Sequence, residues 1–236
     1  IKHRKAGQDA KRAKVFTKII RELTVAARDG GGNVEDNPSL RTVVEKAKSA
    51  QMPKDTMERA IARGAGGQDG ADLVALTYEG YGPGGVAFLV ETMTDNRNRT
   101  VAEVRHIFSK SGGNLGTDGS VAYLFDKRGQ IFFEPGVSEE SLFELAIEAG
   151  ADDVEIEGDG SIAVITSPDA FTHVKAQVDE AGMTPALAEI TMAPQTYAEL
   201  DEEMSERIIK MIDLLEELDD VTNVYTNANL SAAYGE

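Results

Sequence analysis

The amino-acid sequence predicts an α+β protein of three domains: an N-terminal three-helix bundle and two α/β domains, the third a ferredoxin-like βαββαβ unit inserted in the second. Two observations favour this fold class. Apolar residues recur at helical spacing up to about residue 67, whereas strand and helix patterns alternate from about residue 73. A last helix and strand follow the βαββαβ unit and can return to the earlier sheet. The expected domains are residues 1–67, residues 73–128 together with 197–236, and residues 129–196.

Three helices are expected in the N-terminal domain, over residues 7–29, 37–50 and 53–64. The first ends at the Gly30–Gly32 run, because glycine is favoured just beyond the last helical residue. The second begins at Asn37 and Pro38, since asparagine caps a helix N-terminus well and proline suits the first helical position. The Gly64–Gly67 segment that follows the third helix is interpreted as a hinge.

The rest of the chain alternates strands and helices. In the second domain we expect strands over residues 73–81, 86–92, 120–126 and 221–226, and helices over residues 98–111 and 202–218. In the inserted unit we expect strands over residues 130–134, 153–157, 161–166 and 188–192, and helices over residues 139–149 and 168–180. This βαββαβ order defines the ferredoxin-like motif. The glycine-rich segments 81–85 and 111–116 lack the spacing of nucleotide-binding loops and are interpreted as turns.

Composition excludes several classes of protein. Apolar residues make up 41% of the chain, which is typical of a globular protein, and no stretch has the roughly 20 apolar residues of a membrane helix. The absence of cysteine excludes disulfides, thiolate metal sites and thiol catalysis, and is consistent with the cytoplasmic location that we expect. The three histidines lie far apart. We therefore expect no catalytic residues, metal, cofactor, small-molecule substrate or membrane partner.

Charge is distributed unevenly along the chain. The formal net charge is -17, but residues 1–67 hold 15 basic and 8 acidic side chains, a balance of +7, and the remainder carries −24. A basic module is joined to a strongly acidic body. A polyphosphate would be attracted by the first and repelled by most of the second.

The basic residues of the N-terminal domain form the main candidate site for nucleic acid. On the first helix, cations lie opposite the apolar face, and further cations precede that helix or lie one turn apart on the third. Rows of Lys and Arg can follow a phosphate backbone, and Arg can also contact base edges. The alternative is a solvated basic helix face. The candidate residues are Lys2, His3, Arg4, Lys5, Lys11, Arg12, Lys14, Lys18, Arg21, Arg59 and Arg63.

Two further candidates lie at a junction between a strand and a helix. Arg97 and Arg99 are two of only nine cations after residue 67. A helix N-terminus with arginine, asparagine and threonine can hold a phosphate. In the alternative interpretation, Asn98 caps the helix and the two arginines pair with local carboxylates.

The last helix carries an acidic face. Three interpretations remain open for it: a solvated surface, a protein-binding surface, or a mask over the basic domain. Its acidic residues are Asp201, Glu202, Glu203, Glu206, Glu216, Glu217, Asp219 and Asp220.

Several long motifs resemble one known family. They cover essentially the whole chain and comprise Ile1–Lys5, Lys18–Arg28, Met52–Thr56, Tyr78–Gly85, Thr94–Thr100 and Gly112–Gly116. These stretches are similar to those of the YebC/PmpR family. The resemblance implies a helical N-terminal domain, two α/β domains with the third inserted in the second, and a non-enzymatic cytoplasmic protein.

The same resemblance implies a role in gene expression. Bacterial members are commonly described as DNA-binding transcriptional regulators, mitochondrial relatives act as translational activators, and a ribosome-associated role has been proposed. Our first hypothesis is therefore a DNA-binding transcriptional regulator, with DNA as its partner. The alternative is an RNA-binding translation factor that associates with the ribosome through ribosomal RNA. A protein–protein adaptor is a third class.

Overall fold

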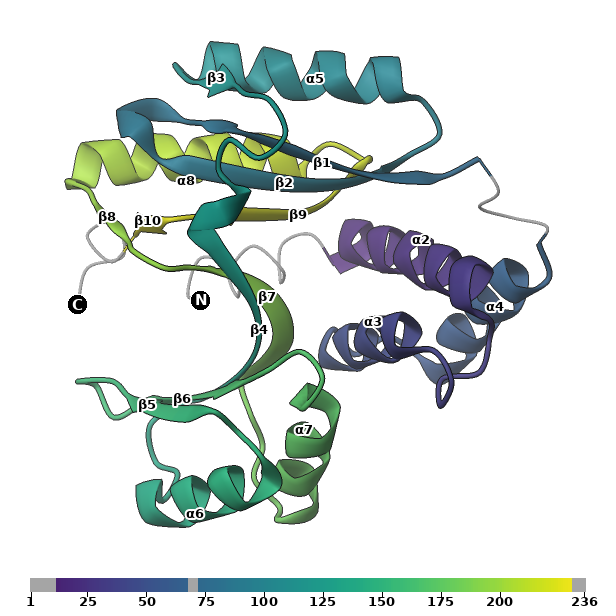
Figure 1. Cartoon of the computed structure of the whole chain (residues 1–236), viewed down its shortest axis with the longest axis vertical. Coiled ribbons are helices and arrows are strands. Elements are labelled where there is room, and N and C mark those ends of the chain that lie inside the picture. Colours follow the sequence, from purple (N-terminus) through teal and green to yellow (C-terminus); the bar gives the residue numbers. More distant parts are fainter. Residues whose placement is uncertain (1–11, 68–71, 231–236) are drawn as a thin grey trace.

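The computed structural model describes residues 12–67 and 72–230, and Figure 1 shows their arrangement. The predicted nucleic-acid contacts Lys2, His3, Arg4, Lys5 and Lys11 lie outside these ranges. Within them the chain is a mixed α+β protein whose first helices lie beside two α/β units, one above the other in Figure 1. The predicted fold class is confirmed, including the inserted βαββαβ unit.

The N-terminal unit consists of three helices: α2 (Arg12–Gly30), α3 (Pro38–Ser49) and α4 (Lys54–Ala65). Asn37 connects the first two. Its side chain accepts a hydrogen bond from the Leu40 amide at 3.1 Å and donates to the carbonyls of Ala26 and Gly31, both at 2.8 Å. It therefore caps the start of α3, as expected, and also satisfies carbonyls near the end of α2.

Gly64 is a packing residue rather than part of a hinge. It is buried within α4, and a side chain there would overlap the carbonyl oxygen of Thr24 and lie 3.0 Å from the Cβ of Ala27. The absence of a side chain lets α4 approach α2 closely. The sequence interpretation of Gly64–Gly67 as a hinge is therefore wrong for its first residue, because a glycine required for close helix packing has the same local signature as a flexible one.

The second unit is a sheet of order β3-β1-β2-β9. Its strands are β1 (Val74–Tyr81), β2 (Ala87–Thr94), β3 (Asn114–Leu115) and β9 (Val221–Thr226). The helices α5 (Arg97–Lys110) and α8 (Glu202–Glu216) pack on one face of this sheet. There the rings of Phe88 and Phe108 meet edge to face, with their centroids 5.8 Å apart. Because β9 pairs with β2, the end of the chain returns to the earlier sheet, as predicted.

The inserted unit is a second sheet, of order β5-β6-β4-β7. Its strands are β4 (Phe125–Phe133), β5 (Asp153–Ile156), β6 (Ile162–Thr166) and β7 (Leu187–Pro194), and its helices are α6 (Glu139–Ala149) and α7 (Phe171–Glu180). All its strand pairs are antiparallel. This is the ferredoxin-like arrangement that the element order predicts.

Two strands predicted around residues 120–134 form a single one. The structure has a 3-10 turn at Ala122–Leu124 and then the continuous strand β4. The polar segment Asp126–Arg128, which includes the end of the first predicted strand, is paired with residues 191–193 of β7. A long partner strand thus keeps a polar stretch extended, which local pattern could not indicate.

Smaller elements complete the connections: the 3-10 turn Pro83–Gly85 and the short strands β8 (Ala198–Glu199) and β10 (Ala228–Asn229).

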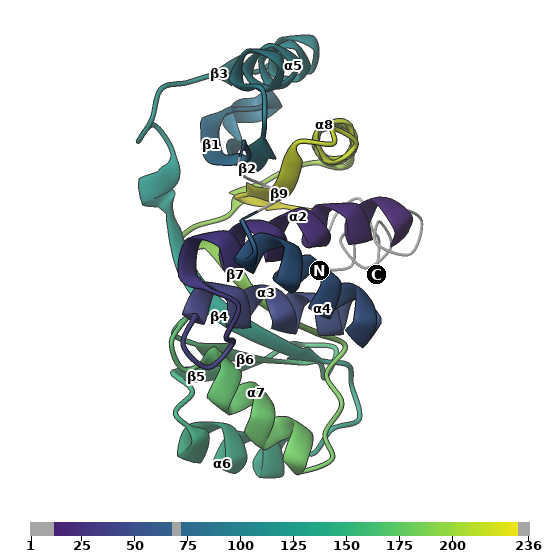
Figure 2. The same ribbon diagram turned by 90° about the vertical axis from the view of Figure 1, so that its right-hand side faces the viewer.

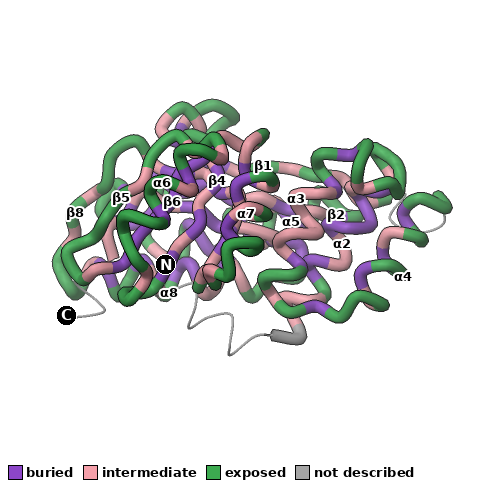
Figure 3. Tube along the Cα trace, turned by 90° about the horizontal axis from the view of Figure 1, so that it is seen from below, coloured by how far each residue is buried: buried purple, intermediate pink, exposed green. Residues whose placement is uncertain are grey.

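Figure 2 shows the N-terminal helices between the second unit and the inserted unit. Figure 3 shows buried positions recurring along strands and on the inner faces of helices. Each unit has its own apolar cluster. Within the described ranges, no helix is long and apolar enough to cross a membrane.

Candidate nucleic-acid interface

The predicted cationic face of α2 is docked against the second unit. Lys14, Lys18 and Arg21 follow one another at spacings of four and three residues, so their side chains leave the helix on the same side. The Lys14 ammonium donates to the carbonyl of Glu217 and lies 3.6 Å from the carboxylate of Asp219. The Lys18 ammonium donates to the carbonyl of Glu216, and this lysine is only 9% exposed.

The acceptors lie at the C-terminal end of α8. The last carbonyls of any helix lack partners within it and form the negative end of its dipole. This helix has no basic residue in its last turn, and the chain continues with the acidic residues Glu216, Glu217, Asp219 and Asp220. Cations from α2 therefore supply the positive charge that α8 lacks. Of the acidic face, Asp219 and Asp220 at this end pair with cations of the basic helix, whereas Asp201, Glu202, Glu203 and Glu206 are exposed.

Asp220 is the centre of this contact. Its carboxylate is 2% exposed and accepts hydrogen bonds from Arg99 at 2.9 Å, from the Thr100 hydroxyl at 2.9 Å and from Arg21 at 3.3 Å. Burial raises the pKa of Asp220, but the hydrogen bonds from Arg99 and Thr100 and the charge of Arg99 outweigh burial and lower the pKa below its ordinary value. The carboxylate is thus held ionised between two units of the chain.

Arg99 is consequently engaged within the protein. Besides Asp220, it contacts Asp95 at 2.8 Å, and these two carboxylates raise the pKa of its guanidinium. The helix cap is Asn96, whose side chain accepts from the Arg99 amide at 3.1 Å, and not Asn98 as the alternative interpretation assumed. Arg97 is exposed and makes no hydrogen bond or ion pair with any residue in the described ranges.

Two of the remaining candidates lie on α4. Arg59 and Arg63 are both exposed and one helical turn apart on α4. Lys54, at the start of the same helix, is also exposed and lies 3.7 Å from Glu58. We call Lys54, Arg59 and Arg63 the α4 cation surface. Arg12 begins α2, and its side chain is outside the described part of the structure.

Comparison with known proteins identifies the family. The model of the TACO1/YebC N-terminal domain matches residues 1–67, and the model of the TACO1/YebC second and third domain matches residues 73–228.

The chain belongs to the TACO1/YebC family.

This membership confirms the resemblance found in the sequence. A "Probable transcriptional regulatory protein" of Alcanivorax borkumensis is 62% identical over 237 residues, covering 100% of this chain and 96% of that protein. The "Transcriptional regulatory protein PmpR" of Pseudomonas aeruginosa is 60% identical over 230 residues, covering 98% and 93%. The crystal structure of the conserved hypothetical protein Aq1575 from Aquifex aeolicus superposes with a TM-score of 0.79 at 48% identity, covering 94% of this chain and 91% of that one.

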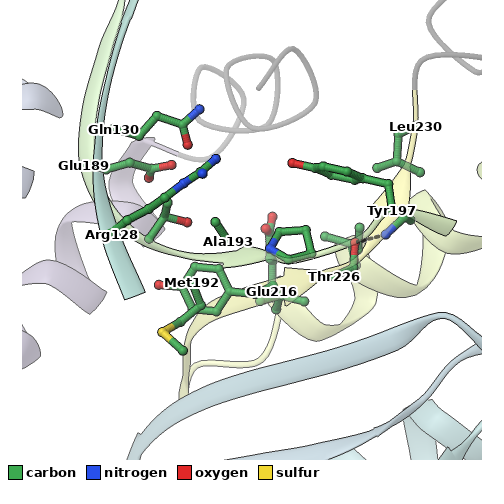
Figure 4. Close-up of a pocket in the computed structure, with 15 residues that line it drawn as sticks. Arg128, Gln130, Glu189, Met192, Ala193, Tyr197, Glu216, Thr226 and Leu230 are labelled. Atoms are coloured by element: carbon green, nitrogen blue, oxygen red, sulfur yellow. Dashed lines mark hydrogen bonds between the residues drawn. The ribbon is translucent and has the colours of Figure 1, made fainter. Parts of the chain in front are cut away.

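This YebC-family chain also has a small cavity between its two four-stranded sheets. The cavity measures about 190 Å³ and is bordered by β4 and β7 on one side and by α8 and β9 on the other. In Figure 4, Arg128, Gln130 and Glu189 lie on one side of it and Tyr197 on the other. The Arg128 Nε is buried without a hydrogen-bond partner among the described residues. The mixed charges of Arg128, Glu189 and Glu216 favour no particular class of small ligand.

Sequence reasoning missed the acceptors of the α2 cations. Asp220 and the carbonyls of Glu216 and Glu217 decide what Lys14, Lys18 and Arg21 contact. A signal was present, because acidic residues at a helix C-terminus are unfavourable unless an outside cation compensates them. No group of three or more His, Asp or Glu side chains suited to a metal occurs in residues 12–67 and 72–230.

Proposed function

We propose that this chain is a DNA-binding transcriptional regulator that contacts the duplex through the outer side of its N-terminal domain. The observation that carries the proposal is the segregation of charge, with +7 in residues 1–67 and −24 in the rest. Duplex DNA presents a dense row of phosphates, which attracts the first region and repels most of the second. The names of the relatives from Alcanivorax and Pseudomonas support a role in transcription.

The contacts of the docked cations favour the opposite side of the N-terminal domain as the one that meets DNA. Lys14, Lys18 and Arg21 are turned toward the acidic end of α8 and its buried Asp220. A duplex on that side would meet the carboxylates of the second unit. The α4 cation surface is exposed instead, and the cations of residues 1–12 belong to the same domain. We therefore assign the phosphate contacts to Lys54, Arg59 and Arg63 together with those N-terminal cations.

Phosphate contact rather than base recognition is the expected mode. Exposed Lys and Arg on a short helix position a protein on the backbone, whereas sequence is read in the grooves by side chains held at fixed angles. Affinity should accordingly fall steeply with salt and differ little between duplex sequences.

The test compares two double variants in duplex binding, measured by fluorescence anisotropy over a series of salt concentrations. Arg59→Ala with Arg63→Ala should weaken binding and reduce the slope of log affinity against log salt by about 2, since each phosphate contact contributes about one counterion. Lys110→Ala with Lys210→Ala removes the same charge from exposed positions of the second unit and should leave the slope unchanged.

Co-sedimentation of the protein with purified ribosomes tests the alternative, a translation factor. Little ribosome association, together with the loss of slope in the α4 variant, would support the transcriptional proposal. Ribosome binding that excess duplex DNA does not displace would overturn it and make the chain a translation factor that binds ribosomal RNA. An unchanged salt slope in the α4 variant would show that these arginines are not the contacts.

A further inference from the structure

One edge of the second unit's sheet is open. Strand β1 pairs with β2 along all of Val74–Tyr81, but its other neighbour, β3, pairs only with Gly80 and Tyr81. One more edge bond joins the Gly116 amide to the Glu79 carbonyl at 2.7 Å. From Val74 to Tyr78 this side of the strand has no partner strand in the described ranges.

The pairing pattern shows which backbone groups face the open edge. The Glu79 carbonyl points outward, because it accepts from Gly116. The Met93 amide donates to the backbone carbonyl of Asp220, on the side of β2 that faces away from β1. Met93 and its partner Ala75 therefore form a pair without mutual hydrogen bonds. Since orientation alternates along a strand, the N–H and C=O groups of Ala75 and Thr77 also point outward.

A groove lies along these groups. It has a volume of about 480 Å³, with β1 as its floor, the first turns of α5 as one wall and Asp118 on the other. The loop wall is held in place by the buried carboxylate of Glu79, which accepts from the amides of Gly119 at 2.6 Å and Ala122 at 2.6 Å.

Within residues 12–67 and 72–230, this edge lacks the usual protection against strand addition. Exposed edges are normally blocked by lysine, proline, a bulge or a covering element. The open segment Val74–Tyr78 has neither lysine nor proline, and its outward residues Ala75 and Thr77 are small and exposed. No lysine or proline of this segment therefore blocks the approach of a free strand to Ala75 and Thr77.

We propose that this groove binds an extended acidic peptide segment of a partner protein, which adds to β1 as a further strand. Arg97 lines the groove from α5, is exposed, and forms no ion pair within the described ranges. Arg105 is exposed on the same helix. Burial raises the pKa of the Tyr78 hydroxyl, and the positive charges of Arg97 and Arg105 each act to lower it. Side chains of an added strand alternate between faces, so acidic residues at every second position would lie on the α5 side.

Two other occupants fit less well. In an antiparallel pairing of two copies through β1, the Arg97 and Arg105 of one copy would approach those of the other on the same face, which is repulsive. A single-stranded nucleic acid could use the arginines, but its backbone has no alternating donors and acceptors to match Ala75 and Thr77. An acidic peptide strand can both pair with the two arginines and form backbone hydrogen bonds with Ala75 and Thr77.

The test uses the full chain labelled with ¹⁵N and a capped peptide of three Glu-Thr repeats. We expect titration to shift the amide signals of Ala75 and Thr77 and to slow their hydrogen exchange. Thr77→Pro should abolish these effects, because it removes the outward N–H and leaves the hydrogen bonds to β2 intact. Thr77→Val keeps the N–H and should bind normally. Arg97→Glu should weaken binding about threefold, as expected for an exposed charge pair.

The controls separate the alternatives. Equal binding of a Lys-Thr peptide, or of the acidic peptide to Thr77→Pro, would overturn the proposal. A ten-residue oligo-dT that shifts the same amides and displaces the peptide would make the groove a nucleic-acid site. Protection of Ala75 and Thr77 in the free protein, with a dimer in sedimentation, would assign the edge to a second copy. If Thr77→Pro fails to fold, the Arg97→Glu and Lys-Thr results decide.

Discussion

Asp220 shows how one side chain can connect elements far apart in the sequence. It immediately precedes β9, and its partners Arg21, Arg99 and Thr100 come from α2 and α5. A buried carboxylate without partners would be strongly destabilising, whereas one that accepts several charged hydrogen bonds stabilises the fold. The adjacent Asp219 has 79% of its side chain exposed, so the same residue type has different roles at neighbouring positions.

Replacing Asp220 with asparagine should lower the free energy of unfolding by about 2 kcal/mol at pH 7, since hydrogen bonds to a charged group are lost or weakened. The pKa of Asp220 is lowered in the folded protein, so this stabilisation is complete above the unfolded pKa of about 4. It is lost as the pH falls through the folded pKa. Urea unfolding of both proteins between pH 7 and pH 3 measures the difference.

Asp219→Asn is the matched control. It removes the same charge one position earlier, and we expect a change within about 0.5 kcal/mol because the site is exposed. A difference between wild type and Asp220→Asn that stayed constant down to pH 3 would contradict the role assigned to the ionised carboxylate.

At the scale of elements, the contact between α2 and α4 depends on a glycine. Gly64 lies within the helix, where glycine lowers helix stability by about 1 kcal/mol relative to alanine. Helix propensity alone would therefore favour alanine. The carbonyl of Thr24 and the Cβ of Ala27 occupy the space that the new side chain would need.

For Gly64→Ala we expect a net loss of about 2 kcal/mol, because overpacking a close helix contact costs more than the gain in propensity. Chemical denaturation of the full chain measures it. Gly66→Ala is the comparison: Gly66 is exposed with φ −78, and its nearest contact would be the Ala62 carbonyl at 3.2 Å, so a smaller change is expected. A stabilising effect at Gly64 would show that the two helices can separate without cost.

For the molecule as a whole, the placement of the N-terminal domain determines which charges face solvent. It is held on the second unit by α2 and on the inserted unit by α3, where the Ser49 hydroxyl donates to the Ala188 carbonyl at 3.2 Å. The basic domain therefore presents one side to its own acidic body, while its α4 cation surface stays exposed. Docking engages Lys14, Lys18 and Arg21 in contacts within the chain and leaves Lys18 buried and the other two partly buried.

Lys14→Ala combined with Lys18→Ala should loosen this docking. We expect a larger radius of gyration in small-angle X-ray scattering and a loss of about 2 kcal/mol in unfolding free energy, because charged hydrogen bonds to helix carbonyls disappear. Lys48→Ala with Lys54→Ala removes the same charge from exposed positions of the bundle and should change neither quantity. An unchanged radius in the first variant would show that apolar contacts alone hold the domains together.

Most helices and strands were predictable because their signals are local. Asn37 and Pro38 mark the start of α3, and α6 spans the predicted residues 139–149. Strand β4 was not predictable as one element, since its polar centre is kept extended by pairing with β7. The candidate site was predictable as a set of cations, but local sequence does not show which of them face another domain.

The sequence by itself determined the fold class, the family and the separation of a basic domain from an acidic body, because periodicity, motif and charge are properties of the chain order. Tertiary structure alone decided that α2 lies against the end of α8 and that Asp220 binds Arg21 and Arg99. It also decided that one edge of β1, from Val74 to Tyr78, has no partner strand among the described residues. These features depend on contacts between residues up to about 200 positions apart, such as Lys14 with Glu217 at a separation of 203. Such contacts join separate units of the chain, and they decide which of the predicted cations are engaged within the protein.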